Sequence, residues 1–462
     1  MTTAQILVPT LQVGDAASQQ TMDMVRALDR RGWTVRLRGG YPASALPADM
    51  ATRYAIAKPG DDPGVADLTV LKYPGWYALA ETFRTVTGPA LFWYHGVTPP
   101  ELWQGEDRRD ILRNGQVRSD LAWYAHLAAA DSPFGAQELH RLSGYPLERI
   151  RVVPLGFDLT AWSAAPDRAG LDALRQRWQV TGKRVLLYVG RLSAHKRIDL
   201  PIRALAHLAD EAPDLHLLVV GDVDANPTAR ILHGDLADLA RSLGVADRVT
   251  FTGRVETVTP FYHLAHVAIL ASQHEGFGAP LVEAMSAGTP VIASASGSMP
   301  WVVTGDEPDQ AGGLLFQPGE VGDLAARIRT LLDGDLRARF AAQARRRAED
   351  FSMDNFEKRV MAVVEETVEL AGRGDKLRNP VIDHPLYAQA DVALRGPRPR
   401  SGVPVLGPLI DWVRRNSTTH IKEAYLDRII EQQVNVNRAL LAEIQRLQAE
   451  VDELKGRLER GA

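Results

Sequence analysis

The residues best suited to chemistry lie in one stretch, from 274 to 294, which holds two glutamates around a glycine-rich turn. Glu275 and Glu283 have seven residues between them, and Pro280 suits the first turn of a helix, where its missing N–H is not needed. A glycine-rich turn that leads into a helix leaves backbone N–H groups unpaired, which favours an anionic ligand such as phosphate. Because a carboxylate can accept two hydroxyl hydrogen bonds at once, the paired glutamates suggest a sugar nucleotide as the ligand.

Two basic residues lie on another predicted strand-to-helix loop. Arg191 and Lys196 follow a predicted strand at 184–189 and precede a predicted helix at 200–210. Together they can neutralise a diphosphate, Arg191 through its planar fork and Lys196 as a point charge. The alternative is an ordinary pair of exposed loop charges. The position of the loop, at the same expected sheet edge as Glu275, favours phosphate binding.

Three further positions have weaker signals. His95 closes a predicted strand and could hydrogen-bond a sugar or move a proton, or it could be a structural histidine. Gly14 lies in the first strand-to-helix loop, where either a close backbone approach to a ligand or a plain tight turn fits. Asp222 and Asp224 have the spacing of a magnesium pair, but the Asn226-Pro that follows favours a turn.

The elements that would position these residues alternate between short apolar strands and amphipathic helices. Strands are expected at 6–11, 34–38, 68–73, 90–94, 129–131 and 151–155, and again at 184–189, 215–221, 249–253, 267–271, 290–294 and 313–316. Helices are expected at 20–31, 76–87, 119–130, 200–210, 231–243, 258–265, 281–286, 324–333, 335–349 and 353–371. This alternation predicts an α/β fold with two facing Rossmann-like doubly wound domains, which bind ligands at the carboxyl ends of their strands.

The pattern divides the chain into four parts. We expect an N-terminal Rossmann-like domain at 1–165, a second Rossmann-like domain with closing helices at 166–371, a Pro/Arg-rich linker at 372–412 and a helical tail at 413–462. In the tail, 430–458 follows a heptad pattern in which seven of nine seam positions are apolar and Asn437 occupies one a position. This predicts a parallel dimeric coiled coil, and a lone helix folded back on the body is the alternative.

Composition excludes several classes of protein. The 462 residues are 45% hydrophobic and 24% charged, with a net charge of −4 that gives no general attraction to nucleic acid. There is no cysteine, so disulfides and thiolate chemistry are excluded. The start of the sequence has no signal-peptide pattern and no apolar run is long enough for a membrane span, so we expect a cytoplasmic protein. The basic linker leaves a peripheral contact with the inner face of a membrane as an alternative to a solvated tether.

With these residues in view, the stretch from 6 to 371 resembles GT-B-fold glycosyltransferases of the retaining family 4. The likeness is strongest at Gly190-Arg191 with Lys196, at 249–255 and at Glu275-Gly-Phe-Gly-Ala-Pro-Leu-Val-Glu283. The resemblance implies that Arg191 and Lys196 hold the donor diphosphate, that Glu275 and His95 contact the transferred sugar and that Glu283 binds the ribose. It also implies that 1–165 is the acceptor-side domain and that 166–371 is the nucleotide-sugar-binding domain. Further donor contacts are implied at Gly14, Gly253, Arg254, Val255, Phe277, Gly278, Ala279 and Leu281.

The resemblance implies a sugar transfer from a nucleotide-diphosphate sugar to a glycan, lipid-linked or other glycoconjugate acceptor, with retention and without a cofactor or a required metal. The leaving phosphate itself would accept the acceptor's proton, since no protein nucleophile stands out. One departure is Trp301, which occupies a place where the family tends to have a glutamate. The alternatives are another GT-B-type enzyme, such as a sugar-nucleotide epimerase or a phosphorylase, and a catalytically silent scaffold assembled through the coiled coil.

Overall fold

The computed structural model describes residues 2–58, 60, 61, 64–103, 106–306, 311–379 and 382. The chain separates after Asp375 into two units, and both sheets belong to the first. The predicted coiled coil at 430–458 and most of the predicted linker lie outside the described residues. In the part of the chain that is described, no helix is both long and apolar enough to cross a bilayer.

The first sheet has the strand order β3-β2-β1-β4-β5-β6-β7, and every strand pair in it is parallel. Its strands are β1 (Thr3–Val8), β2 (Thr34–Gly39), β3 (Tyr54–Ile56), β4 (Leu68–Tyr73), β5 (Ala90–Tyr94), β6 (Leu127–Ala130) and β7 (Ile150–Val152). Every residue of β4, β5 and β6 is buried, as expected for central strands covered on both faces.

The second sheet has the order β10-β9-β8-β11-β12-β13 and is also parallel throughout. Its strands are β8 (Arg184–Val189), β9 (Leu215–Val220), β10 (Val249–Gly253), β11 (Val267–Leu270), β12 (Val291–Ser294) and β13 (Gly313–Phe316). The prediction of two parallel, doubly wound sheets is therefore confirmed.

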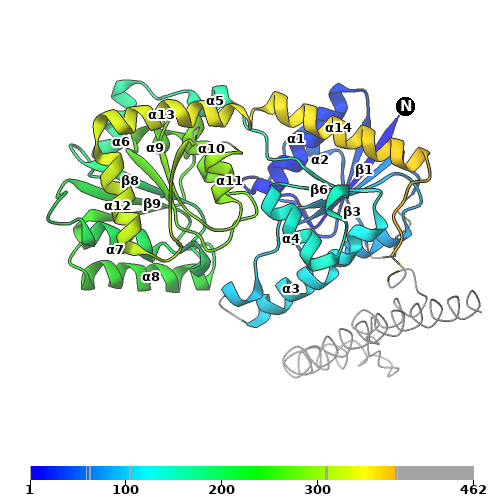
Figure 1. The fold of residues 1–462 in the computed structure, drawn as a ribbon, viewed down its shortest axis with the longest axis horizontal. Coiled ribbons are helices and arrows are strands. Elements are labelled where there is room, and N and C mark those ends of the chain that lie inside the picture. Colours follow the sequence, from blue (N-terminus) through cyan, green and yellow to red (C-terminus); the bar gives the residue numbers. More distant parts are fainter. Residues whose placement is uncertain are drawn as a thin grey trace, which may run out of the picture. The chain divides into compact units, whose positions relative to one another are not determined.

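Helices flank both sheets (Figure 1). The α-helices are α1 (Ala16–Arg30), α2 (Ala48–Ala51), α3 (Glu106–Val117), α4 (Pro133–Ser143), α5 (Leu159–Ser163), α6 (Arg168–Arg177), α7 (Asp199–His207), α8 (Pro227–Ser242), α9 (Thr259–Leu264), α10 (Ala279–Ser286), α11 (Met299–Thr304), α12 (Val321–Leu332), α13 (Gly334–Glu349) and α14 (Met353–Gly372). The 3₁₀ helices are η1 (Ala78–Thr85), η2 (Pro100–Leu102), η3 (Arg118–Tyr124), η4 (Leu147–Arg149), η5 (Ala194–Lys196) and η6 (Ala246–Arg248).

Two expected helices take a different form. The segment expected as a helix at 76–87 is the 3₁₀ helix η1, and the helix expected at 119–130 is wrong. There the chain forms η3 and then the buried strand β6. The alanines of β6 have high helix propensity, but pairing with β5 and β7 overrides that local preference.

The last helix returns to the first sheet. Phe356, Val360 and Val364 of α14 are buried in the same apolar cluster as β1, β4 and β5, and α14 packs against α1 (Figure 1). The expected scheme grouped 353–371 with the second domain because it follows that domain in the chain. Its apolar face instead completes the core of the first.

The chain passes between the two sheets twice, once near Phe157 and once at 351–353, and these two crossings are hydrogen-bonded to each other. The N–H of Phe157 donates to Phe351 O at 2.8 Å, and the N–H of Met353 donates to Phe157 O at 3.1 Å. Phe277 stacks on Phe157 and lies edge-on to Phe351, so the turn after β11 packs directly on the crossings. We call Phe157, Phe277, Phe351 and Trp301 the hinge cluster, because Trp301 also packs edge-on to Phe351.

Candidate functional site

The turn between β11 and α10 is held in a conformation that needs glycine. Gly278 has a φ of 93°, in the left-handed region, and precedes the first residue of α10. A side chain on Gly276 would place its Cβ 2.3 Å from the carbonyl oxygen of His95. The hydroxyl of Ser298 donates to the carbonyl oxygens of Glu275 and Phe277, at 3.0 and 2.7 Å. The turn is therefore fixed by its own backbone and by its neighbours.

Glu275 and Lys196 form a short ion pair. Lys196 Nζ lies 2.5 Å from Glu275 Oε1, and the Ser272 hydroxyl donates to the same oxygen at 2.7 Å. Burial alone would raise the pKa of Glu275, but Lys196 and Ser272 together hold it below its ordinary value. The site thus contains a fixed carboxylate with a cation directly beside it.

Arg191 lies on the same loop as Lys196 and is exposed. Its carbonyl oxygen accepts from the Tyr188 hydroxyl at 2.9 Å, while its guanidinium has no hydrogen bond or ion pair with any residue that the structure describes. Burial, followed by the charge of Lys196, lowers the pKa of the neighbouring His195 to about 4. The charge of Arg191 also lowers this pKa, and that of Glu275 raises it. The structure therefore brings Arg191, Lys196 and Glu275 to one place.

Glu283 lies within α10. Its Oε2 accepts from the Tyr262 hydroxyl at 2.6 Å, and burial raises its pKa to about 7. One carboxylate oxygen of Glu283 thus already accepts a hydrogen bond from Tyr262. Additional hydroxyl donors would stabilise the charged form of this group.

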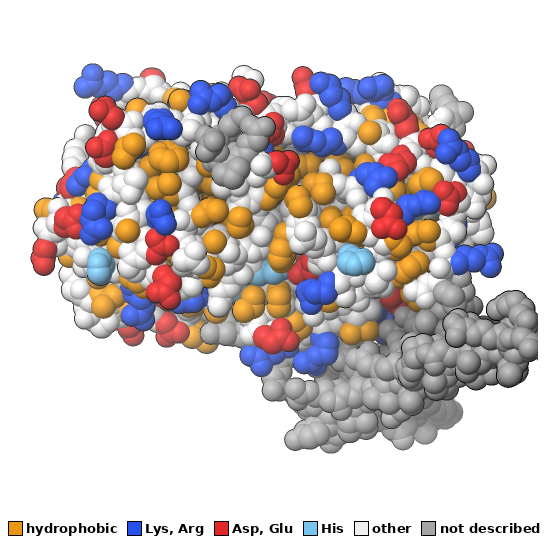
Figure 2. Space-filling model, viewed as in Figure 1, with side chains coloured by type: hydrophobic (Ala, Val, Ile, Leu, Met, Phe, Trp, Pro, Cys, Tyr) orange, Lys and Arg blue, Asp and Glu red, His pale blue; other side chains and the backbone are white. Residues whose placement is uncertain are grey.

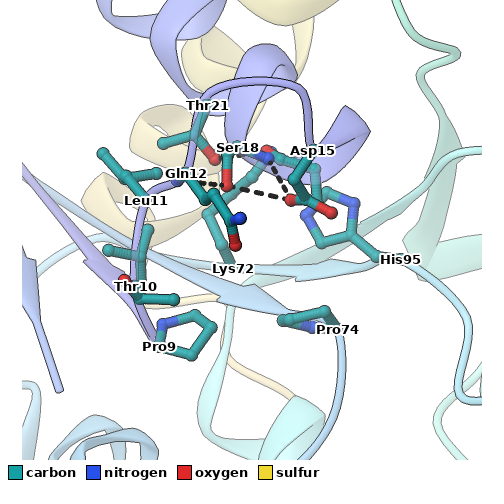
Figure 3. A pocket seen from close by; sticks show the side chains of 12 residues that line it. Pro9, Thr10, Leu11, Gln12, Asp15, Ser18, Thr21, Lys72, Pro74 and His95 are labelled. Carbon is teal, nitrogen blue, oxygen red and sulfur yellow. Dashed lines mark hydrogen bonds between the residues drawn. The ribbon is translucent and has the colours of Figure 1, made fainter. Parts of the chain in front are cut away.

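His95 lies at the carboxyl end of β5, beside a cavity of about 200 Å³ (Figure 3). Residues of the loop between β1 and α1 line the same cavity, among them Gln12 and Asp15. Gly14 in that loop has a φ of 86°, and Asp15 caps α1 by accepting from the N–H of Ser18 at 2.9 Å. The cavity therefore joins the histidine and the first loop, which the sequence selected separately.

The remaining candidates are placed differently. Gly253, Arg254 and Val255 lie at the end of β10, the edge strand of the second sheet, and Arg254 is exposed. The side chains of Phe277 and Leu281 are buried in the core, and the N–H of Leu281 donates to Gly278 O at 2.9 Å. Leu281 therefore offers neither its side chain nor its backbone N–H for the predicted donor contact.

The turn itself keeps unpaired donors at the start of α10. The backbone N–H groups of Phe277, Gly278 and Ala279 have no acceptor among the described residues. They lie where the positive end of the helix dipole adds to the attraction for an anion.

Two features have structural roles. Trp301 packs in the hinge cluster, and its carbonyl oxygen accepts from Arg347 Nη2 at 2.8 Å. Asp222 accepts from the N–H of Asp224 at 3.0 Å, and Arg230 donates to Asp224, which is the predicted turn.

Several polar groups at the site were not singled out from the sequence. Asp131 contacts His95, Glu138 contacts His274 at 3.0 Å, and Ser132 donates to Gly276 O at 2.8 Å. One local signal was available, because Asp131 directly follows the strand beside β5 and so shares a sheet edge with His95.

Two parallel Rossmann-like sheets joined by paired crossings, with a glycine-rich turn and two cations at the strand ends, define the GT-B class of glycosyltransferases. Comparison with known proteins gives the family. Residues 172–347 match the family described as glycosyl transferases group 1. The D-inositol 3-phosphate glycosyltransferase of Xylanimonas cellulosilytica is 33% identical over an alignment of 388 positions, and the match covers 74% of this chain and 89% of that protein. The chain belongs to this family, the retaining family 4 of GT-B fold, and is a glycosyltransferase that takes its sugar from a nucleotide sugar.

Other relatives match over shorter stretches. The Kineococcus radiotolerans protein of the same name is 37% identical over an alignment of 228 positions, and the match covers 46% of this chain and 51% of that protein. Among solved structures, Anabaena Alr3699/HepE in complex with UDP has a TM-score of 0.64 at 20% identity, and the match covers 79% of this chain and 100% of that chain. At that identity the structural likeness shows the fold.

Proposed function

We propose that the protein moves a sugar from a nucleotide-diphosphate sugar to a hydroxyl of a glycan or lipid-linked acceptor, with retention of the anomeric configuration. The observation that carries this proposal is that hydrogen-bond donors without a full set of acceptors converge on one turn. Arg191 has no counter-ion among the described residues, Lys196 shares one carboxylate, and the N–H groups at 277–279 have no acceptor there. This arrangement suits two phosphates with sugar hydroxyls beside them.

The proposed reaction follows from these charges. The bond from the anomeric carbon to the β-phosphate oxygen breaks, and its electron pair stays on that oxygen. Arg191, Lys196 and the start of α10 stabilise the negative charge as it develops. The acceptor hydroxyl attacks the same face of the anomeric carbon, and its proton passes to the leaving phosphate oxygen. Because two protein cations already face the phosphates, we propose that no metal is required.

The two glutamates have separate roles in this proposal. Glu275, ionised beside Lys196, accepts hydrogen bonds from the donor sugar, and Glu283 accepts them from the ribose. His95 contacts the transferred sugar from the first domain, and the loop at Gly14 lies beside the donor phosphate. Gly253, Arg254 and Val255 would contact the base, which would require the nucleotide to extend along the second sheet toward β10.

A nucleotide panel tests the donor site directly. Thermal shifts with UDP, GDP and ADP should show one clear stabiliser, and Arg191→Gln should weaken its affinity at least tenfold and lower transfer. Arg168→Gln, which removes the same charge from the exposed start of α6, is the matched control and should leave both unchanged. Wild-type affinity and turnover in Arg191→Gln would contradict the proposal.

The tail forms a separate part of the proposal. We propose that 430–458 dimerises the protein as a parallel coiled coil, which is supported by its heptads and by Asn437 at an a position. Light scattering on a chain truncated near Asn416 should show half the mass of the full chain. An unchanged mass would remove the dimer from the proposal.

A further inference from the structure

Asp131 lies next to His95 because of strand register. Tyr94 of β5 pairs with Ala130 of β6, so the residues that follow them lie side by side at the carboxyl edge of the first sheet. The side chains meet there, with His95 Nδ1 2.8 Å from Asp131 Oδ2. Asp131 is 4% exposed, so its contact with His95 is shielded from solvent.

The other oxygen of Asp131 receives two N–H donors. Gln20 Nε2 donates to Asp131 Oδ1 at 2.9 Å, and Trp93 Nε1 donates to the same oxygen at 3.0 Å. Burial would raise the pKa of Asp131, but His95, Lys72 and Trp93 hold it below its ordinary value. The group is therefore a carboxylate, which only accepts hydrogen bonds, and Nδ1 of His95 must carry a proton.

The amide of Gln20 is fixed in turn by Lys72. Lys72 Nζ donates to Gln20 Oε1 at 2.7 Å and lies 3.8 Å from the centre of the Trp93 ring. Gln20 must therefore turn its N–H donors toward Asp131. Lys72, Gln20, Trp93 and Asp131 form one chain of contacts that ends at His95.

The opposite nitrogen of His95 is left without a partner. His95 Nε2 is buried and has no hydrogen-bond partner among the described residues, and His95 lines the cavity beside the loop at Gln12 and Asp15 (Figure 3). Burial is the main cause that lowers the pKa of His95, and Lys72 adds to it, while the charges of Asp131 and Asp15 oppose the shift. The ring is therefore neutral near pH 7 and Nε2 is an unmet acceptor.

We propose that Asp131 is a positioning residue, which holds His95 in the Nδ1–H tautomer so that Nε2 accepts a hydrogen bond from a substrate hydroxyl in this cavity. This inference rests on the proposed function, since a sugar substrate supplies the hydroxyl. Asp131 itself does not touch the substrate, and it acts through the imidazole alone.

The substitution Asp131→Asn gives a directional test. Gln20 and Trp93 both donate toward the Oδ1 position, so the new amide must keep its oxygen there and turn its NH₂ toward His95. Nδ1 then has to accept, and the proton moves to Nε2, which can no longer accept from a hydroxyl. An orienting carboxylate of this kind affects turnover far more than binding.

Two measurements follow from this argument. In ¹⁵N-histidine NMR, with the resonance identified by comparison with His95→Gln, wild-type His95 should be protonated at Nδ1 and Asp131→Asn at Nε2. The variant should lose about 100-fold in kcat while it keeps wild-type affinity for the stabilising nucleoside diphosphate. Asp120→Asn, another buried carboxylate of the first domain, should leave the tautomer of His95 unchanged.

The outcomes separate this inference from the proposed function. If His95 of the wild-type protein has the Nε2–H tautomer, the role of Asp131 is overturned. This result does not depend on whether any variant folds. A switched tautomer with unchanged kcat would overturn it as well. Failure of every nucleoside diphosphate to bind the wild type would instead contradict the donor site, while the NMR result would still report the tautomer.

Figure 2 shows how the charges are distributed on one face of the molecule, where basic and acidic side chains are interspersed. The chain of Lys72, Gln20 and Asp131 differs from that surface, because Lys72 is 1% and Gln20 2% exposed. Burial lowers the pKa of Lys72 to about 7, and the charge of Asp131 opposes this shift.

Discussion

Replacing Glu283 by glutamine should make the protein more stable and a worse binder of nucleotide. Burial raises the pKa of Glu283 from 4.5 to about 7, so the native state holds this proton more tightly than the unfolded state does. The contribution to stability is therefore greatest below about pH 4.5, is lost progressively as pH rises, and is gone above about pH 7. At about 1.4 kcal/mol per pKa unit, the change across this window is about 3 kcal/mol.

Glutamine carries no charge and keeps an oxygen for the Tyr262 hydroxyl, which donates to Glu283 at 2.6 Å. Near pH 8, the free energy of unfolding of Glu283→Gln should therefore exceed that of the wild type by up to about 3 kcal/mol. Near pH 4 the two free energies should be equal. The measurement is the free energy of unfolding in urea across this range. The control is Glu365→Gln, on the exposed side of α14, which should parallel the wild type.

Nucleotide affinity should move in the opposite direction. The single amide oxygen would have to serve the Tyr262 hydroxyl and the two ribose hydroxyls, so calorimetry should show at least a tenfold loss of nucleotide affinity in Glu283→Gln. Wild-type affinity should also fall as pH drops below about 7, because the protonated acid is a poorer acceptor. Parallel stability curves for Glu283→Gln and the wild type would refute the buried-charge argument, and unchanged affinity would refute the ribose role.

Three further substitutions test the site and its support. Lys196→Met should destabilise the protein by about 3 kcal/mol in urea, because it leaves Glu275 buried without its cation, and adding Glu275→Gln should recover most of that loss; a double variant no more stable than the single one would contradict the pairing. Trp301→Ala should cost about 3 kcal/mol without changing nucleotide affinity, and a loss of affinity alone would give Trp301 a role in the site. Gly276→Ala should abolish transfer while the second domain still binds nucleotide, because its Cβ would collide with the carbonyl of His95; wild-type transfer rates would show that this approach is unimportant.

Local features of the sequence were sufficient for individual strands of both sheets. The buried run at 184–189 forms β8 to the residue, and the strand predicted at 68–73 forms β4 to the residue. Each is bounded by turn residues and covered on both faces, so the apolar run and the strand coincide. The glutamate pair and its turn were found for the same reason, since all their parts lie within one short segment.

The contacts missed from the sequence join distant parts of the chain. Gln20 meets Asp131 across 111 positions, and Lys72 meets Gln20 across 52. No spacing rule connects such residues until the strand order is known. Helix α4 was also missed, although Ser132 caps its start and Gly144, with a φ of 67°, ends it, and these are local signals.

The return of α14 to the first sheet has a consequence for how the protein is made. Phe356, Val360 and Val364 are needed to close the first core, yet they follow the entire second domain in the chain. The second domain can complete its sheet as soon as it has left the ribosome, whereas the first must wait with an open apolar face until α14 emerges. The half synthesised first is therefore the last to be finished, and chains halted before Met353 should be the ones that chaperones retain.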